Sequence, residues 1–417
     1  MNELRKDKLT QLRKVLCLVS VVIMLSGLLF SRLLLSSGLT IFAISCFIGQ
    51  SVKDKIKTFV YSPLLWSMSL LFLLPLISGL WSADILKWSQ ILRIKLPFFL
   101  LPLSVAGLDD FKKEDWEKIG FAFLSLVLIG AGWSLWQYLQ DVQLVQAAYL
   151  RAQTIKTPLG NDHVRFSLLV SIAILTAIFL AVNTQKKLRT AIVAGLWLET
   201  GLLIIYLHVL AVRTGLICFY VGATISIVWF LAKLKNNWRY AWVLVFVISI
   251  PFVSWFAFPT FKNRISYLRY DLSFIKDNVY RTGSNDGNRL VSIKAGWELQ
   301  NKHPLTGVGF GDIETETGKW YRVNYPQMTD TDRILPSSEW MIYGAGAGWP
   351  GFLLLSAIMV IPFFLKTREA TICWVLLNIS MALSYLFDIG LEVQYGVFIH
   401  AFILLWWYKW LNVVPKM

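Results

Sequence analysis

The chain has 417 residues, of which 56% are hydrophobic and only 16% are charged, and its mean hydropathy is +0.58. This composition excludes an ordinary soluble domain and predicts a polytopic membrane protein. The formal net charge of +15 would suit nucleic acid, but the basic residues stand in short loops between apolar runs, where membrane topology explains them. We therefore expect no nucleic-acid partner. The four cysteines lie in apolar runs without metal-ligand spacing, which predicts packing roles and no disulfide framework.

Apolar runs of membrane length occur about twelve times along the chain, which predicts an all-α fold with about twelve transmembrane helices. The basic N-terminus precedes the first run without a convincing cleavage site, so we expect a retained first helix and no signal peptide. The predicted helices cover residues 15–30, 33–49, 62–80, 91–107, 119–138, 163–183, 190–210, 212–232, 240–258, 342–365, 371–387 and 393–411.

Basic residues gather in the loops on one side of these helices, and the positive-inside rule makes that side cytoplasmic. An even number of helices then places both termini in the cytoplasm. The predicted parts are residues 1–258 with nine helices, residues 259–340 as one large extracytoplasmic loop, and residues 341–417 with three helices. The charged run from Asp109 to Lys118 lies on the cytoplasmic side, and we interpret it as a solvated face. The basic residues that carry the orientation are Arg5, Lys6, Lys8, Arg13, Lys14, Lys53, Lys55, Lys57, Lys186, Lys187, Arg189, Lys233, Lys235, Arg239, Lys366 and Arg368.

The large loop is mixed in charge and contains helix-like stretches such as Asn263 to Val279, which predicts an ordered, partly helical cap. Its most informative stretch begins at Asn285. Here Asp286 or Asn288 is a candidate N-cap, so Arg289 would lie on the first turn of a helix. A guanidinium group at the start of a helix and the free N–H groups of its first turn can bind the same phosphate oxygens. The apolar residues at helical spacing are Leu290, Ile293 and Trp297.

The predicted helix ends in the sequence His-Pro-Leu-Thr-Gly-Val-Gly-Phe-Gly at residues 303–311, where Pro304 stops the helix and the glycines allow tight turns. Together with an arginine that opens a Trp-containing helix, this sequence resembles the large extracytoplasmic loop of the bacterial O-antigen ligase and O-antigen polymerase superfamily. The sequence Gly-Trp-Pro-Gly at residues 348–351 is similar to the Gly-x-x-Gly that opens the next membrane helix in that superfamily.

The resemblance implies a membrane glycosyltransferase of the C type. Such an enzyme moves a glycan from undecaprenyl diphosphate to an acceptor hydroxyl on the periplasmic face of the bacterial inner membrane, among membrane lipids. The resemblance also implies that cations replace a metal ion and that no cofactor is needed. The sequence is compatible with this, because it has no Asp-x-Asp pair on the outer face, no cluster of His and Cys, and no nucleotide-phosphate loop.

Arg289 and Arg213 are the residues expected to stabilise the diphosphate. Arg213 stands in Ala-Val-Arg-Thr-Gly-Leu, which is similar to the Ser-Arg-x-Gly turn of the superfamily, with Val212 in the place of Ser. The plainer alternatives are a loop salt bridge for Arg289 and an interfacial, snorkelling arginine for Arg213.

The general base departs from the superfamily pattern, because Ser337 and Ser338 stand where a His-Asn pair is usual. The adjacent Glu339 is the candidate base, since an ionised carboxylate close to the acceptor hydroxyl can take its proton. A capping or salt-bridging role is the alternative. His208 and His303 are possible substitutes for the missing histidine. The last outer loop offers two further candidate carboxylates, Asp388 and Glu392, whereas His400 is expected to be a packing residue.

Seven residues are predicted to bind substrate: His208, His303 and Ser337, named above, and Arg93, Lys95, His163 and Arg165. Arg93 and Lys95 lie near the outer end of the fourth predicted helix, where they could equally contact lipid headgroups. His163 and Arg165, in Pro-Leu-Gly-Asn-Asp-His-Val-Arg, open the sixth helix and resemble a polar motif of the superfamily, although simple helix capping also explains this stretch.

The sequence does not decide which molecule accepts the glycan. Lipid A core, which would make the protein a ligase, is the first choice. A growing lipid-linked glycan would make it a polymerase, and an exported protein would make it an O-oligosaccharyltransferase. A transporter of polysaccharide or lipid-linked oligosaccharide is the rival from another class, but it would need charges deep in the bundle and related halves. A non-catalytic assembly scaffold is a further alternative.

Overall fold

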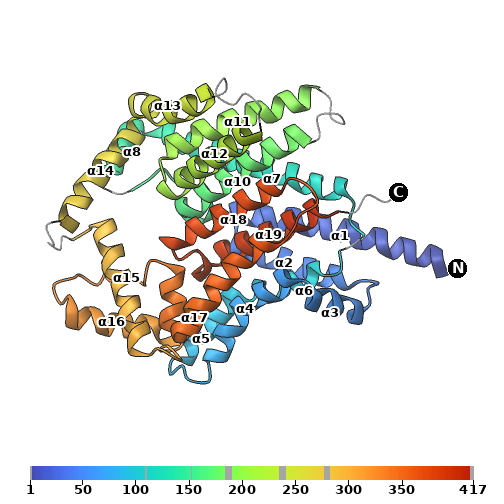
Figure 1. Ribbon diagram of the computed structural model, residues 1–417, viewed down its shortest axis with the longest axis horizontal. Coiled ribbons are helices and arrows are strands. Elements are labelled where there is room, and N and C mark those ends of the chain that lie inside the picture. Colours follow the sequence, from blue (N-terminus) through green and yellow to red (C-terminus); the bar gives the residue numbers. More distant parts are fainter. Residues whose placement is uncertain are drawn as a thin grey trace. The chain divides into compact units, whose positions relative to one another are not determined.

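The computed structural model describes residues 2–108, 110–151, 153–183, 190–233, 241–276 and 282–413, and all regular structure within them is helical (Figure 1). Some residues used above fall outside this described part of the chain: Asp109, Lys186, Lys187, Arg189, Lys235, Arg239 and the end of the predicted helix at 277–279. The chain divides into two compact units, and each is described by itself. Unit 1 comprises Met1–Ile119, Asp271–Glu369 and Tyr385–Met417, and unit 2 comprises Gly120–Tyr270 and Ala370–Ser384.

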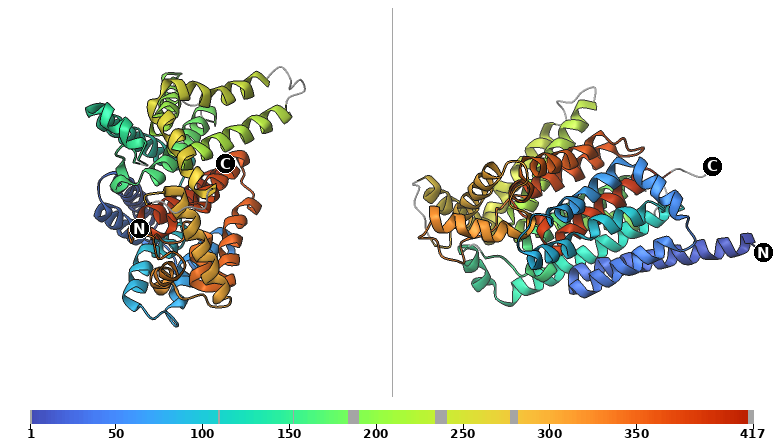
Figure 2. Two further views of the ribbon diagram at one scale, coloured as in Figure 1. Left: turned by 90° about the vertical axis from the view of Figure 1, so that its left-hand side faces the viewer. Right: turned by 90° about the horizontal axis from the view of Figure 1, so that it is seen from below.

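Unit 1 has its core around α4, α6 and α19, which pack together because their sequences are apolar on most faces. Trp406, Trp407 and Trp410 of α19 are fully buried there. The long helix α1 lies beside α2, both drawn in blue in Figure 2. The helices of unit 1 are α1 (Asn2–Phe30), α2 (Arg32–Phe47), α3 (Val52–Tyr61), α4 (Pro63–Ser78), α5 (Ile85–Lys95), α6 (Pro97–Val105), α15 (Asn285–Lys302), η2 (Phe310–Asp312), α16 (Ile313–Asn324), α17 (Glu339–Phe364), η3 (Gly390–Glu392) and α19 (Gln394–Leu411).

Unit 2 is organised around α10, which packs against both α11 and α12 (green in Figure 1). The close approach of α12 depends on Gly215, since a Cβ at this position would lie 2.7 Å from Ser167. Ser171 Oγ donates to Gly215 O at 2.8 Å and ties the two helices together. The helices of unit 2 are α8 (Val142–Tyr149), α9 (Pro158–Asn161), α10 (His163–Asn183), α11 (Thr190–Leu210), α12 (Arg213–Lys233) and α13 (Ala241–Ala257). Three helices run from one unit into the other: α7 (Lys113–Gln140), α14 (Pro259–Lys276) and α18 (Thr371–Leu386).

Six helices of the described residues are long and apolar enough to cross a membrane, or up to seven if the bent pair α2 and α3 counts as one span. They are Asp7–Phe30 within α1, α7, α10, α11, α12 and α17. The chain is thus an all-helical, multi-pass membrane protein, but the expected number of about twelve spans is not confirmed. Several expected spans are shorter helices. The run at 62–80 holds α4 of 16 residues, and the run at 91–107 divides at Pro97 into α5 and α6, because proline removes a helical N–H and crowds the preceding turn.

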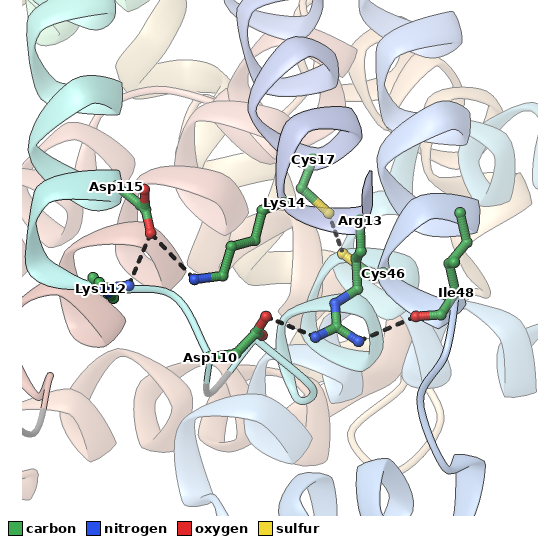
Figure 3. Close-up of polar contacts among 8 residues, drawn as sticks. All are labelled: Arg13, Lys14, Cys17, Cys46, Ile48, Asp110, Lys112 and Asp115. Atoms are coloured by element: carbon green, nitrogen blue, oxygen red, sulfur yellow. Dashed lines mark hydrogen bonds and ion pairs between the residues drawn. The ribbon is translucent and has the colours of Figure 1, made fainter. Parts of the chain in front are cut away.

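The charged run, whose described residues 110–118 include the start of α7, is solvated only in part: Lys112, Glu114 and Lys118 are exposed, but two of its carboxylates pair with basic residues of α1. Arg13, which is 3% exposed, donates to Asp110 Oδ2 at 2.7 Å and to Ile48 O at 3.1 Å (Figure 3). Asp115 likewise faces Lys14 at 3.6 Å (Figure 3). The run is therefore partly buried, because its carboxylates neutralise basic residues of α1 that would otherwise lie unpaired against the core.

The four cysteines are free thiols, and three of them are buried, in agreement with the predicted packing roles. Cys17 of α1 and Cys46 of α2 face each other with sulfur atoms 3.6 Å apart (Figure 3). Cys373 is half-buried.

Helix α17 is broken at Gly348, whose φ of 66° lies in the left-handed region. The loop 303–309 after α15 docks against this break through backbone hydrogen bonds, which satisfy peptide groups that the break releases. The Gly-Trp-Pro-Gly sequence thus lies at a kink inside α17, whose start at Glu339 is close to the expected start at 342, and it opens the part of the helix that follows the kink. The docking hydrogen bonds are Val308 N to Ala345 O (2.8 Å), Gly309 N to Gly346 O (3.0 Å) and Trp349 N to Pro304 O (2.8 Å).

Candidate functional site

The first turn of α15 is closed by protein groups. Ser284 is the N-cap and its Oγ accepts from Gly287 N, so the predicted caps Asp286 and Asn288 are wrong. The hydroxyl of Ser284 takes this place because it precedes the helix in an extended conformation, where it can reach the first free amide. The buried carboxylate of Asp271 accepts from Ser284 Oγ and from Asp286 N. Protein oxygens therefore occupy the N–H groups of Asp286 and Gly287, and these two groups do not serve a phosphate at this helix end.

Arg289 is half-buried and is the fifth residue of α15, so it lies at the start of the second turn and not on the first turn as predicted, because the helix begins earlier than expected. Its Nε donates to Asn285 Oδ1 at 3.2 Å, and its Nη1 donates to Phe387 O at 2.6 Å. Phe387 begins the segment 387–393 between α18 and α19, which we call the 387–393 connection. The guanidinium group is thus anchored at two points and retains further N–H groups for another partner.

Glu339 is the first residue of α17 and is fully buried. Its Oε1 accepts from Leu391 N of the 387–393 connection, and its Oε2 is buried without a hydrogen-bond partner among the described residues. Burying a carboxylate oxygen without a hydrogen-bond donor costs free energy. We therefore interpret Oε2 of Glu339 as a position that a donor group of a bound molecule can occupy. Ser337, just before this helix, is also buried, and its N donates to Ser292 Oγ, which in turn donates to Arg289 O.

Lys95, at the end of α5, is fully buried beside the same connection. Its Nζ lies 2.5 Å from Glu392 Oε1, 3.1 Å from Leu391 O and 3.5 Å from Tyr343 Oη. These contacts use the three N–H donors of an ammonium group. Arg93, which was predicted to bind substrate together with Lys95, lies on the same helix. Its Nε donates to Ser89 O, one turn earlier in α5. The two cations therefore differ in environment although two positions separate them.

The 387–393 connection is where the structure brings predicted residues of unit 1 together. Arg289 contacts its first carbonyl, Glu339 accepts from its Leu391 N, and Lys95 binds Leu391 O and Glu392. Sequence reasoning placed Glu392 among candidate carboxylates but missed that it pairs with Lys95. No local pattern could have revealed this pair, because 297 positions separate the two residues.

Helix α16 packs against α15 and supports its orientation (Figure 1). Ala295 of α15 is buried with Trp320, Tyr321 and Met328 in one apolar cluster. Tyr321 Oη donates to Ile334 O at 3.0 Å. Burial raises the pKa of the Tyr321 hydroxyl, so it remains a protonated donor at neutral pH and holds the chain that leads into α17.

His303, the other predicted residue of unit 1, caps the C-terminal end of α15 with its backbone and is half-buried. Its N donates to Leu299 O, and its O accepts from Gly307 N. These two hydrogen bonds give its main chain a role in the loop that docks on α17.

The remaining predicted residues lie in unit 2. His208 is buried in α11, where Nδ1 contacts Ile204 O at 2.7 Å and Nε2 contacts Tyr220 Oη at 2.6 Å. Both ring nitrogens are thus engaged within the helix bundle. Arg213 is half-buried and begins α12 shortly after Ala211, whose φ of 49° makes the turn between α11 and α12 tight.

Arg165 and His163 lie in the first turn of α10, as predicted. Asp162 Oδ1 accepts from Arg165 N, and Asp162 Oδ2 pairs with Arg165 Nη1 at 2.9 Å. The capping interpretation of this stretch is thereby confirmed for Asp162. A substrate contact of the two residues stays a prediction.

The fold and these contacts define a multi-pass, all-helical membrane protein in which Arg289 and Glu339 contact backbone groups of the same 387–393 connection. Residues 200–356 match the family model described as O-Antigen ligase. This match confirms the resemblance seen in the sequence and supports the O-antigen ligase-like superfamily, whose general activity is membrane glycan transfer of the ligase or polymerase type. Arg213, Arg289 and Glu339 lie within the matched residues. No curated protein matches the sequence of the chain.

Proposed function

We propose that the protein transfers a glycan from undecaprenyl diphosphate to an acceptor hydroxyl at the periplasmic face of the bacterial inner membrane, with lipid A core as the first-choice acceptor. One observation carries the proposal. Arg289 and Glu339, both within the residues that match the O-antigen ligase family, contact the same 387–393 connection, one with a cation and the other with a carboxylate.

The proposed reaction is a single displacement at the anomeric carbon of the donor glycan. The acceptor oxygen forms the new glycosidic bond while its proton passes to Oε2 of Glu339. The bond from the anomeric carbon to the diphosphate oxygen breaks, and its electron pair leaves with undecaprenyl diphosphate. Glu339 supplies the base because its second oxygen has no hydrogen-bond partner among the described residues. Such a displacement inverts the configuration at the anomeric carbon.

The leaving diphosphate needs a positive partner, and Arg289 is our first assignment for it. A guanidinium fork matches two phosphate oxygens and keeps its charge at any physiological pH. Its hydrogen bond to Phe387 O fixes the side chain without neutralising it. Arg213 is assigned a second contact with the diphosphate from its sequence motif alone. These cations would take the place of a divalent ion, so transfer is expected to persist in EDTA.

The Arg289 assignment is tested by transfer from a lipid-diphosphate glycan in nanodiscs. Arg289→Ala is expected to lower the rate by about 10²- to 10³-fold, because a preorganised contact with developing charge is lost. Arg289→Lys should retain part of the activity, since it keeps the charge without the fork. Arg322→Ala is the matched control, because Arg322 is exposed on α16 of the same unit. Wild-type turnover by Arg289→Ala would remove the central assignment.

The acceptor is identified by deleting the gene and analysing lipopolysaccharide, glycoproteins and the lipid-linked glycan pool. We expect long donor glycan to accumulate beside unmodified lipid A core. Bare protein acceptors with normal lipopolysaccharide would instead identify a protein O-oligosaccharyltransferase, and accumulated single repeat units would identify a polymerase.

A further inference from the structure

The environment of Lys95 points away from a substrate-binding role. The side chain is 0% exposed, and Glu392, Leu391 O and Tyr343 Oη account for its three N–H donors. The ammonium group also lies 4.9 Å from the centre of the Tyr343 ring and 5.8 Å from that of Phe310. A cation enclosed in this way has no donor left for a diphosphate, yet its burial costs free energy that a merely structural position could avoid with an apolar residue.

Leu391 links this lysine to the proposed base. Its carbonyl oxygen accepts from Lys95 Nζ at 3.1 Å, while its N–H donates to Glu339 Oε1. The next residue, Glu392, pairs with the same ammonium group at 2.5 Å. The short turn η3 that contains both residues also packs tightly on α19, because a Cβ on Gly396 would lie 1.9 Å from Gly390 O. The turn is therefore held from two sides at the point where it touches Glu339.

We propose that Lys95 is a positioning residue: together with Glu392 it fixes η3, so that Leu391 N holds one oxygen of Glu339 and leaves the other free to accept the proton of the acceptor hydroxyl. This inference rests on the proposed function of Glu339 as the base. Without the ammonium group, Glu392 and the carbonyl of Leu391 lose their shared partner, and the turn no longer determines where the carboxylate points.

A double-mutant cycle tests the inference in the full-length protein, with undecaprenyl-diphosphate glycan and lipid A core as substrates. Lys95→Met should lower kcat by about 10- to 10²-fold and leave the KM for the donor unchanged, because the residue touches no substrate. Glu339→Gln should lower kcat by about 10²- to 10⁴-fold. The double variant should be no slower than Glu339→Gln alone, since a residue that acts through Glu339 adds nothing once the base is gone.

Two further variants keep the test decisive. Glu392→Gln retains the size and the hydrogen-bonding capacity of the side chain, and it should give the same non-additive pattern with a smaller loss if Lys95→Met does not fold. Lys87→Met is the matched control on the same helix, because its ion pair with Glu314 is exposed, and it should keep wild-type kinetics.

Three outcomes would overturn the role of Lys95: multiplicative losses in the double variant, a raised donor KM at unchanged kcat, or wild-type kinetics of both Lys95→Met and Glu392→Gln. Each of these leaves the base assignment intact if Glu339→Gln remains slow. Wild-type turnover by Glu339→Gln would instead refute the proposed base, and with it the basis of this inference.

Discussion

Gly307→Ala tests directly whether the 303–309 loop docks on α17, because Gly307 lies where the loop meets the break in that helix. Its φ of 62° is in the left-handed region, which side chains with a Cβ rarely adopt. A Cβ at this position would lie 2.4 Å from Ala345 O, Ala347 N and Gly346 C. These neighbours are backbone atoms, so neither side can relieve the clash by rotating a side chain, and the loop must move away.

The expected loss of stability follows from the interactions that this movement of the loop breaks. Three backbone hydrogen bonds hold the loop on α17, and each contributes about 0.5–1.5 kcal/mol net. The left-handed conformation adds about 1–2 kcal/mol for a residue other than glycine. Gly307→Ala should therefore destabilise unit 1 by about 3–6 kcal/mol. The three hydrogen bonds join Val308 to Ala345, Gly309 to Gly346 and Trp349 to Pro304.

The assay is thermal unfolding in detergent, followed by intrinsic tryptophan fluorescence, with transfer activity measured on the same preparation. We expect a clearly lower Tm and loss of transfer, because α15 and α17 carry Arg289 and Glu339. Gly318→Ala in α16 is the matched control, since a Cβ there would have no neighbour within 4 Å and alanine favours a helix. An unchanged Tm for Gly307→Ala would show that the loop does not dock on α17 as described.

Two further predictions concern helix packing. Arg13→Met should lower the stability by about 1–3 kcal/mol, because it leaves Asp110 without its buried partner, and a Tm equal to that of the wild type in detergent would contradict the buried ion pair. Gly215→Ala should also lower the Tm and raise protease sensitivity, since its Cβ would lie 2.7 Å from Ser167 of α10. Gly222→Ala on the same helix is the control and should be neutral, because a Cβ there would have no neighbour within 4 Å. Equal behaviour of these two glycine variants would refute the close contact of α10 and α12.

Sequence reasoning located helix boundaries well where the signal is local. It placed the start of α10 at His163 and the end of α15 before Pro304, because a capping aspartate and a proline act on their own turn. The expected number of about twelve spans is not confirmed by the described residues. The runs at 62–80 and 91–107 are apolar throughout most of their length, but prolines and turns divide or shorten the helices within them, and hydropathy alone does not register backbone breaks.

The candidate site was predicted in part. The motif around Arg289 and the position of Glu339 near the start of a helix could be identified from the sequence, and the structure adds that both contact the 387–393 connection. The sequence could not assign Lys95 its partners, since an exposed headgroup contact and a buried ion pair have the same local pattern. Only the fold shows that this lysine is enclosed.

The sequence by itself determined the class of protein, the family resemblance and the residues with suitable chemistry, because composition, periodicity and short motifs depend on neighbours along the chain. The tertiary structure decided which charged residues pair with one another. Asp110 lies 97 positions from Arg13, and Glu392 lies 297 positions from Lys95, yet each pair is joined by a buried or partly buried ion pair. The physical reason is that burying a charge requires a compensating group close in space, and which groups become close is set by how the helices pack.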